Sequence, residues 1–177
     1  PVAALAGPVA GTEAITTQGV TASVDHLASD ALEGRGSGER GGRLASDWLA
    51  AQCKALGLTP GGDDGTFFQA FSGQGQSMRN VIATIPGTES GEMVVLGAHY
   101  DHLGLGHQAG SLAFGAGKGK IHNGADDNAS GTGAILEIAK AFVASGKQPR
   151  RRVVFVWFDG EERGLLGSAA FVKNIPF

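Results

Sequence analysis

Residues 153–158 read Val-Val-Phe-Val-Trp-Phe, and the polar sequence Asp-Gly-Glu-Glu follows directly at residues 159–162. Six consecutive apolar residues predict a strand that is buried on both of its faces. Residues 93–98, Met-Val-Val-Leu-Gly-Ala, have the same character and end at His99. Between the two strands, apolar residues at helical spacing predict a helix over residues 129–144. Strand, helix and strand in this order predict an α/β fold with a mixed, mainly parallel sheet flanked by helices.

Two further elements are predicted upstream of these strands. From residue 40 to residue 56, apolar side chains recur at steps of three and four residues, which predicts an amphipathic helix. Residues 81–85 read Val-Ile-Ala-Thr-Ile and end at a Pro-Gly pair, which predicts a strand closed by a turn. Residues 1–20 are rich in Ala, Gly and Thr without a firm period, so we expect an extended or short helical lead-in there.

The composition is that of a globular chain with one domain. Of the 177 residues, 42% are apolar and 18% are charged, which suits one packed core and argues against a disordered polyelectrolyte. A net charge of -3 without a block of like charges argues against nucleic acid as a partner. The apolar stretches are far shorter than the ~18 residues that cross a bilayer, so no membrane partner is expected. The single cysteine, Cys53, can form no internal disulfide.

Three groups of polar residues are expected to meet at one edge of the predicted sheet. In open α/β sheets, ligand-binding groups gather outside the carboxyl ends of the strands. His99 follows one buried strand, and Glu161 and Glu162 follow the other. Asp126 and Asp127 lie just before the intervening helix, where the helix dipole also favours carboxylates. The sequence therefore predicts one functional rim built from three segments.

The residue types in these groups suit a divalent metal site. An imidazole and a carboxylate two residues apart, as in His99 and Asp101, allow the carboxylate to hold the ring of a metal-bound histidine. The adjacent carboxylates of Glu161 and Glu162 repel each other unless a cation or a proton intervenes. One glutamate could bind metal while the other accepts a proton from water. Taken singly, each group also fits an ordinary polar loop, a helix cap or a solvated pair.

Three sequence strings carry a resemblance to a known family. Residues 97–102 (Gly-Ala-His-Tyr-Asp-His), 124–131 (Gly-Ala-Asp-Asp-Asn-Ala-Ser-Gly) and 158–162 (Phe-Asp-Gly-Glu-Glu) resemble the co-catalytic zinc aminopeptidases related to aminopeptidase Y and the secreted bacterial leucyl aminopeptidases. Residues 26–58 are similar to the family's usual lead-in to the catalytic domain. The resemblance covers about residues 24–172 and is most specific over the three strings.

The resemblance implies a role for each site residue. His99 would bind one zinc ion, Asp126 would bridge two zinc ions, and Glu162 would bind the other. Asp101 would orient His99, and Glu161 would act as the general base. The implied enzyme is a hydrolase with two zinc ions per complete catalytic domain, which removes one residue from the N-terminus of a peptide or protein. The resemblance also implies a secreted or periplasmic location.

The family pattern contains ligands that these residues lack. Family members have a further Asp ligand and a further His ligand downstream of the two glutamates, and neither residue type follows Glu162. We therefore expect residues 1–177 to be the N-terminal portion of one catalytic domain, with a sheet that is incomplete at the C-terminal side. The remainder of that domain is an expected partner. Residues 1–177 alone are expected to bind zinc weakly and to be inactive, since catalytic zinc usually has three protein ligands.

Two alternative functions share the same residues. A single-zinc glutaminyl cyclase has a similar fold and similar His, Asp and Glu positions. A non-catalytic binding ectodomain on the same scaffold is the other alternative, although such relatives usually lose metal ligands. The number of zinc ions per chain and the reaction catalysed would distinguish the three functions.

Overall fold

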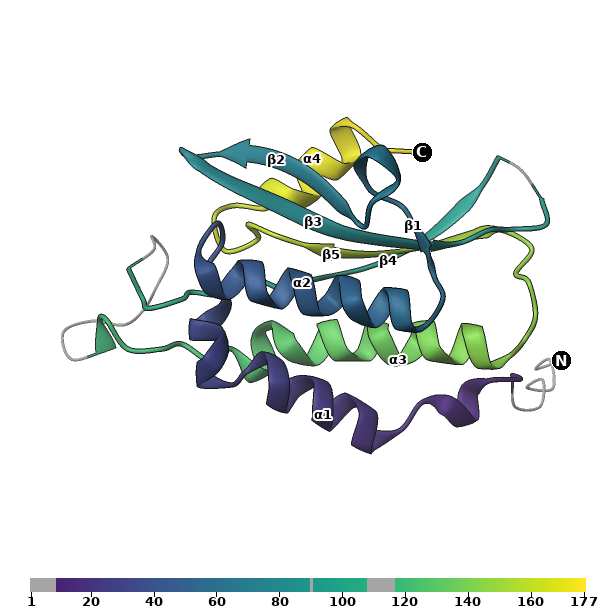
Figure 1. The fold of residues 1–177 in the computed structure, drawn as a ribbon, viewed down its shortest axis with the longest axis horizontal. Coiled ribbons are helices and arrows are strands. Elements are labelled where there is room, and N and C mark those ends of the chain that lie inside the picture. Colours follow the sequence, from purple (N-terminus) through teal and green to yellow (C-terminus); the bar gives the residue numbers. More distant parts are fainter. Residues whose placement is uncertain (1–8, 90, 108–116) are drawn as a thin grey trace, which may run out of the picture.

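The computed structural model describes residues 9–89, 91–107 and 117–177, which form a sheet with helices on both faces (Figure 1). Three helices cover one face: α1 (Thr17–Leu27), α2 (Arg40–Ala55) and α3 (Gly131–Ala144). Helix α4 (Leu166–Lys173) lies on the opposite face. Short helical segments are η1 (Thr12–Ala14), η2 (Asp30–Arg35), η3 (Asp63–Gly65) and the π-helical turn η5 (Ala125–Ser130).

The sheet is mixed, as predicted, and its strand order is β1-β3-β5-β4 with β2 paired to β3. The strands are β1 (Thr59–Pro60), β2 (Phe68–Gly73), β3 (Gln76–Ile85), β4 (Met93–His99) and β5 (Arg152–Phe158). Among the described strands, parallel pairing is confined to β4 and β5, so this sheet is less parallel than the sequence predicted. Parallel neighbouring strands need a crossover connection, and α3 lies in the connection between β4 and β5. A tight turn is enough to join the antiparallel strands β2 and β3.

Strand β5 is buried on both faces, as its apolar sequence predicted. Phe155 and Trp157 pack into the core under α1, α2 and α3, whereas Val154 and Val156 join Phe171 of α4 on the other side. The buried indole N–H of Trp157 donates to the carbonyl oxygen of Thr132 over 3.2 Å, which ties β5 to the start of α3. The central strand therefore holds both helical layers in place.

Strand β4 differs from its predicted burial on both faces. Val94 and Val95 keep 44% and 43% of their surface exposed. Among the described residues, β4 pairs only with β5 and forms the edge of the sheet. Its apolar sequence therefore covers less of the core than that of β5.

Helix α1 begins within the segment, residues 1–20, that was predicted to be an extended or short helical lead-in, and it continues to Leu27. Weak helix formers such as glycine and threonine in its sequence hid the period, and tertiary contacts stabilise it instead. The Thr16 side chain accepts the N–H of Gly19 as an N-cap, and the backbone N–H of Thr16 donates to the buried carboxylate of Glu137 over 3.1 Å. Glu137 also pairs with Lys140 on α3. A carboxylate on α3 thus fixes the start of α1.

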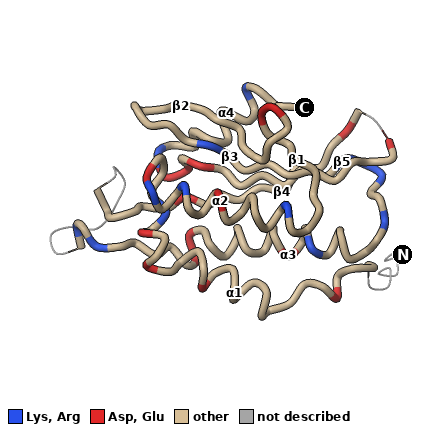
Figure 2. The backbone as a smooth tube through the Cα atoms, viewed as in Figure 1, with Lys and Arg blue, Asp and Glu red and all other residues tan. Residues whose placement is uncertain are grey.

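Helix α2 packs closely on η2, the segment that ends at Arg35. Gly41 allows this approach, because a Cβ atom at this position would lie 2.0 Å from the carbonyl oxygen of Leu32. The predicted helix over residues 40–56 is confirmed almost residue for residue. The beginnings of α2 and α3 and the ends of β4 and β5 all lie at the same end of the molecule, where acidic and basic segments gather (Figure 2).

The contact at Gly41 predicts that replacing this glycine with alanine destabilises the protein, contrary to the usual effect inside a helix. Glycine to alanine inside a helix normally stabilises it, but Gly41→Ala would force the added methyl group into a backbone carbonyl. We expect this substitution to lower the free energy of unfolding by about 1–3 kcal/mol, as overpacking does. Urea unfolding measures the change, with Lys54→Ala on the exposed side of α2 as a control expected to shift it by less than about 0.5 kcal/mol. A stabilised Gly41→Ala protein would contradict the described packing.

Candidate active site

The parallel register of β4 and β5 brings the three predicted polar groups to one rim. His99 at the end of β4 is paired with Phe158 at the end of β5, so the segment with the two glutamates starts beside it. The hydroxyl of Thr132, at the start of α3, donates to the carbonyl oxygen of His99 over 2.9 Å. This bond holds η5, with its two aspartates, against the strand ends. The predicted convergence of the three segments is therefore present in the structure.

The imidazole of His99 lies among carboxylates. Its Nε2 atom is 3.1 Å from Oδ1 of Asp127 and 3.8 Å from Oε2 of Glu161. Its Nδ1 atom lies 3.2 Å from the carbonyl oxygen and 3.5 Å from Oδ1 of Asp101. Burial alone lowers the pKa of His99, but the hydrogen bond and charge of Asp101 and the charge of Glu161 outweigh it and raise the pKa to about 8. With Nδ1 directed at Asp101, Nε2 is the atom available to a metal.

The aspartate that faces His99 is Asp127, the neighbour of the predicted bridging residue Asp126. Among the described residues, no hydrogen bond or ion pair joins the Asp126 carboxylate to His99 or the glutamates, and its carbonyl oxygen accepts the hydroxyl of Ser130. Asp127 has an extended backbone conformation (φ -106°, ψ 98°) inside η5. This break in the helical turn directs its side chain toward His99. Adjacent aspartates are equivalent in charge, so their residue types alone could not tell them apart.

Glu162 lies in the cluster together with a histidine that was not predicted as a ligand. Oε1 of Glu162 is 2.6 Å from Nδ1 of His102. Burial, followed by the charges of Asp127 and Asp101, raises the pKa of Glu162 to about 7. One donor atom each from His102, Asp127 and Glu162 lie within 4.8 Å of one another. Imidazole nitrogen and carboxylate oxygen are donors that zinc prefers, and a cation would relieve the repulsion among these carboxylates, so the residues fit a zinc site.

Glu161 occupies a different position from Glu162. Its side chain is 36% exposed, and its carboxylate approaches the cluster at His99, over 3.8 Å. A carboxylate that stands beside a cluster of metal-ligand types, open to solvent, can accept a proton from water. The two neighbouring glutamates therefore suit the two separate tasks that the sequence predicted for them.

Asp101 contacts both His99 and the turn that carries Glu161 and Glu162. Its carboxylate is fully buried and accepts the backbone N–H groups of Glu161 over 3.2 Å and Glu162 over 3.3 Å. It also accepts the hydroxyl of Ser37 over 2.7 Å and lies beside Nδ1 of His99. Asp101 thus lies where it could orient His99, and its carboxylate fixes the turn that carries both glutamates.

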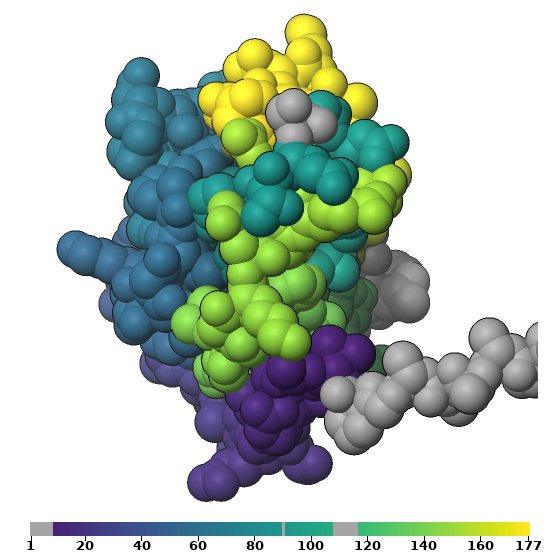
Figure 3. Space-filling model, turned by 90° about the vertical axis from the view of Figure 1, so that its right-hand side faces the viewer, coloured from purple at the N-terminus to yellow at the C-terminus, as the bar shows by residue number. Residues whose placement is uncertain are grey.

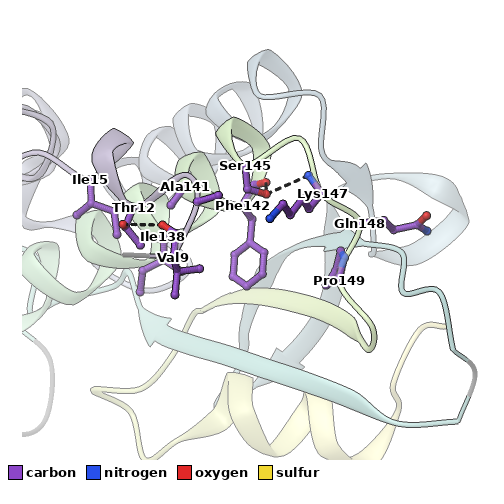
Figure 4. A pocket seen from close by; sticks show the side chains of 11 residues that line it. Val9, Thr12, Ile15, Ile138, Ala141, Phe142, Ser145, Lys147, Gln148 and Pro149 are labelled. Carbon is purple, nitrogen blue, oxygen red and sulfur yellow. Dashed lines mark hydrogen bonds between the residues drawn. The ribbon is translucent and has the colours of Figure 1, made fainter. Parts of the chain in front are cut away.

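An apolar cavity of about 370 Å³ lies at the other end of α3 (Figure 4). Figure 3 shows the first described residues, in purple, against the light-green end of that helix. The described lining of the cavity includes Val9, Ile15, Ile138 and Phe142 and contains no carboxylate or imidazole. The α3 residues that line the cavity begin at Ile138, so at 1.5 Å per residue its near edge lies about 10 Å along the helix from Gly131 at the rim. The charged rim is therefore the candidate active site.

The fold and the rim define an α/β domain with a carboxylate and imidazole cluster suited to a metal-dependent hydrolase. The sequence profile of peptidase family M28 matches residues 80–176, which include every residue of this cluster, and the chain therefore belongs to peptidase family M28. Leupeptin-inactivating enzyme 1 of Streptomyces exfoliatus is 32% identical over 98% of this chain and 36% of its own length. Leucine aminopeptidase 1 of Fusarium vanettenii is 36% identical over 75% of this chain and 32% of its own length. The chain spans about a third of the length of these relatives.

Solved structures share the fold. A Zn-dependent exopeptidase from Parabacteroides distasonis is 25% identical, with a TM-score of 0.64 over 84% of this chain and 48% of its own. A glutaminyl cyclase from Bacteroides thetaiotaomicron has a TM-score of 0.69 at 21% identity, over 92% of this chain and 57% of its own, which is a likeness of fold alone. The zinc exopeptidase fold predicted from the sequence is confirmed. No helix among the described residues is both long and apolar enough to span a bilayer.

The charges around His99 predict a pH dependence of stability in chelator-treated protein. Because the folded state raises the pKa of His99 from 6.5 to about 8, His99 stabilises the fold below pH 6.5 and loses this contribution as the pH rises through 8. We expect the thermal midpoint to fall between pH 6.5 and pH 8.5. His99→Gln should flatten this slope, whereas His107→Gln, at an exposed position outside the cluster, should leave it unchanged. An equal slope in wild type and His99→Gln would contradict the described electrostatics.

Proposed function

We propose that residues 1–177 are the N-terminal portion of the catalytic domain of a zinc-dependent aminopeptidase. The observation that carries this proposal is that Asp127 lies close both to His99 and to Glu162, beside the more open carboxylate of Glu161. Membership of peptidase family M28 and the name of the Fusarium relative support a peptidase that acts on N-terminal residues. The substrates would be peptides or proteins with a free N-terminus, with no role for nucleic acid or membrane.

Zinc is the metal that the site residues and the Parabacteroides structure support. We propose two zinc ions per complete catalytic domain, with His99 and Glu162 each binding one and Asp127, in place of Asp126, between them. When bound, the metal supplies positive charge that polarises the scissile carbonyl and lowers the pKa of water. His102 would hold Glu162 through the 2.6 Å contact at Nδ1. The remaining ligands would come from the rest of the domain.

The residues of this chain then divide the proton transfers and the positioning. Glu161 would accept a proton from the attacking water and later deliver it to the departing amine, since its carboxylate is open to solvent beside the cluster. Asp101 would keep the His99 ring in one orientation through Nδ1. The protonated N-terminal amine of the substrate would be attracted to the acidic rim. The family resemblance also supports a secreted or periplasmic location, which fractionation of the source cells would test.

The proposed activity is tested by counting zinc and by chelation in the full-length protein. We expect two zinc ions per chain and release of p-nitroaniline from leucine p-nitroanilide that EDTA abolishes and zinc restores. Asp127→Asn should lose zinc and activity, whereas Asp126→Asn, one residue away, should keep most of both. Equal losses in the two variants would contradict the assignment to Asp127. One zinc ion with cyclisation of N-terminal glutamine would favour a glutaminyl cyclase, and no turnover with any zinc count would favour a binding ectodomain.

Substitutions of the two glutamates should affect different quantities: the turnover rate for Glu161 and the zinc content for Glu162. Glu161→Gln removes the proposed base and keeps the side-chain volume, so we expect kcat to fall about 10²- to 10⁴-fold at an unchanged zinc content. Glu162→Gln should lower the zinc content itself. Steady-state kinetics combined with atomic absorption measures both effects. If Glu161→Gln lost zinc as readily as Glu162→Gln did, the division of tasks would be refuted.

A further inference from the structure

Arg35 is a fully buried arginine whose described hydrogen bonds all go to backbone carbonyl oxygens. Its Nε donates to Tyr100 over 2.7 Å, and Nη2 donates to Gly124 over 2.8 Å. Nη1 donates over 2.6 Å both to Leu27 and to Asn123. Burying a guanidinium is costly unless its donors are satisfied, and these four hydrogen bonds satisfy four of its five N–H donors without a carboxylate partner. Burial lowers the pKa of Arg35 to about 10, so it stays charged at neutral pH.

Except for that of Leu27 in α1, the carbonyl groups that Arg35 holds belong to two of the segments that build the site. Tyr100 lies between His99 and Asp101, and Gly124 lies directly before η5, which carries Asp127. A single planar group therefore sets the distance between the histidine segment and the aspartate segment. The positive charge also faces the carboxylates of Asp101, Asp127 and Glu162, which favour the charged guanidinium in return.

The third segment is held from the same short stretch of chain. Ser37, fully buried, donates its hydroxyl to Oδ2 of Asp101 over 2.7 Å. Asp101 in turn accepts the backbone N–H groups of Glu161 and Glu162. The backbone of the stretch is also fixed, because the N–H of His102 donates to the carbonyl oxygen of Arg35 over 3.1 Å. Arg35 and Ser37 thus connect, directly or through Asp101, to all three segments of the site.

We propose that Arg35 and Ser37 are positioning residues that hold the three ligand-bearing segments at the separation needed for metal binding. This inference rests on the proposed zinc site. Lysine cannot replace Arg35, because a point charge cannot donate to carbonyl groups on three sides in one plane. Ser37 acts through the carboxylate of Asp101, which loses one of its hydrogen bonds when the hydroxyl is removed. Neither residue touches substrate.

Metal affinity of the full-length protein tests this role without relying on turnover. Zinc is titrated into metal-free wild type, Arg35→Lys and Ser37→Ala by calorimetry, at a temperature well below each unfolding midpoint. Removing residues that support metal ligands typically weakens metal binding about 10- to 100-fold, and we expect a loss in this range for both variants. Arg40→Lys, at a side chain that is 67% exposed and pairs with Glu33, is the matched control and should bind as the wild type does.

A purely structural role would lower the unfolding midpoint but leave the zinc affinity of the folded variants and the visible spectrum of the Co²⁺ forms unchanged. Wild-type affinity and spectrum in both variants would overturn this inference alone. Absence of zinc binding in the wild type would overturn it together with the proposed function. If Arg35→Lys does not fold, Ser37→Ala decides, because it removes one hydroxyl and leaves the Arg35 network intact. Weakened binding and an altered Co²⁺ spectrum in Ser37→Ala would support the proposal.

Discussion

Strands β4 and β5 run side by side in the same direction, and their paired last residues, His99 and Phe158, lie at one edge of the sheet. Helix α3 connects the two strands and begins at that same edge, held there by the bond from Thr132 to His99. Segments about 60 residues apart in sequence therefore meet at this edge. If the two strands were antiparallel, the glutamates would lie at the far end of the sheet from the histidine. The chemistry of the rim depends on this one pairing.

The carboxylates that the pairing of β4 and β5 brings together repel one another, and this repulsion changes the pKa values of the rim. Burial and neighbouring carboxylates raise the pKa of Glu162 to about 7, and carboxylates also raise the pKa of His99 to about 8. Both shifts show a site with an excess of negative charge that takes up positive charge. Protons, the guanidinium of Arg35 and a divalent cation are three sources of that charge, and only the guanidinium is built into the fold. Metal binding and fold stability are thus coupled through the same groups.

The elements that the sequence predicted correctly are those in which one strong pattern acted alone. The two-faced apolar run of β5 and the periodic helix α2 were predicted closely, as was the meeting of the three polar segments. The sequence left open whether a helix forms at α1, because Glu137, far along the chain, stabilises the start of that helix. Asp127 could not be separated from Asp126 by charge, since a local break in η5 decides which side chain faces His99. Arg35 gave no signal, because an arginine in a loop is usually solvated and only the three-dimensional fold buries it.

Arg35 and Ser37 precede all three ligand-bearing segments in the sequence, and this order has a consequence for biogenesis. Ribosomal synthesis proceeds from the N-terminus, so both residues leave the exit tunnel before His99 and long before Glu162. The nascent chain consequently already contains the two proposed positioning residues while the residues of the rim are still being synthesised. The rim is complete only after Glu162 has been added, so its three segments come together late in synthesis.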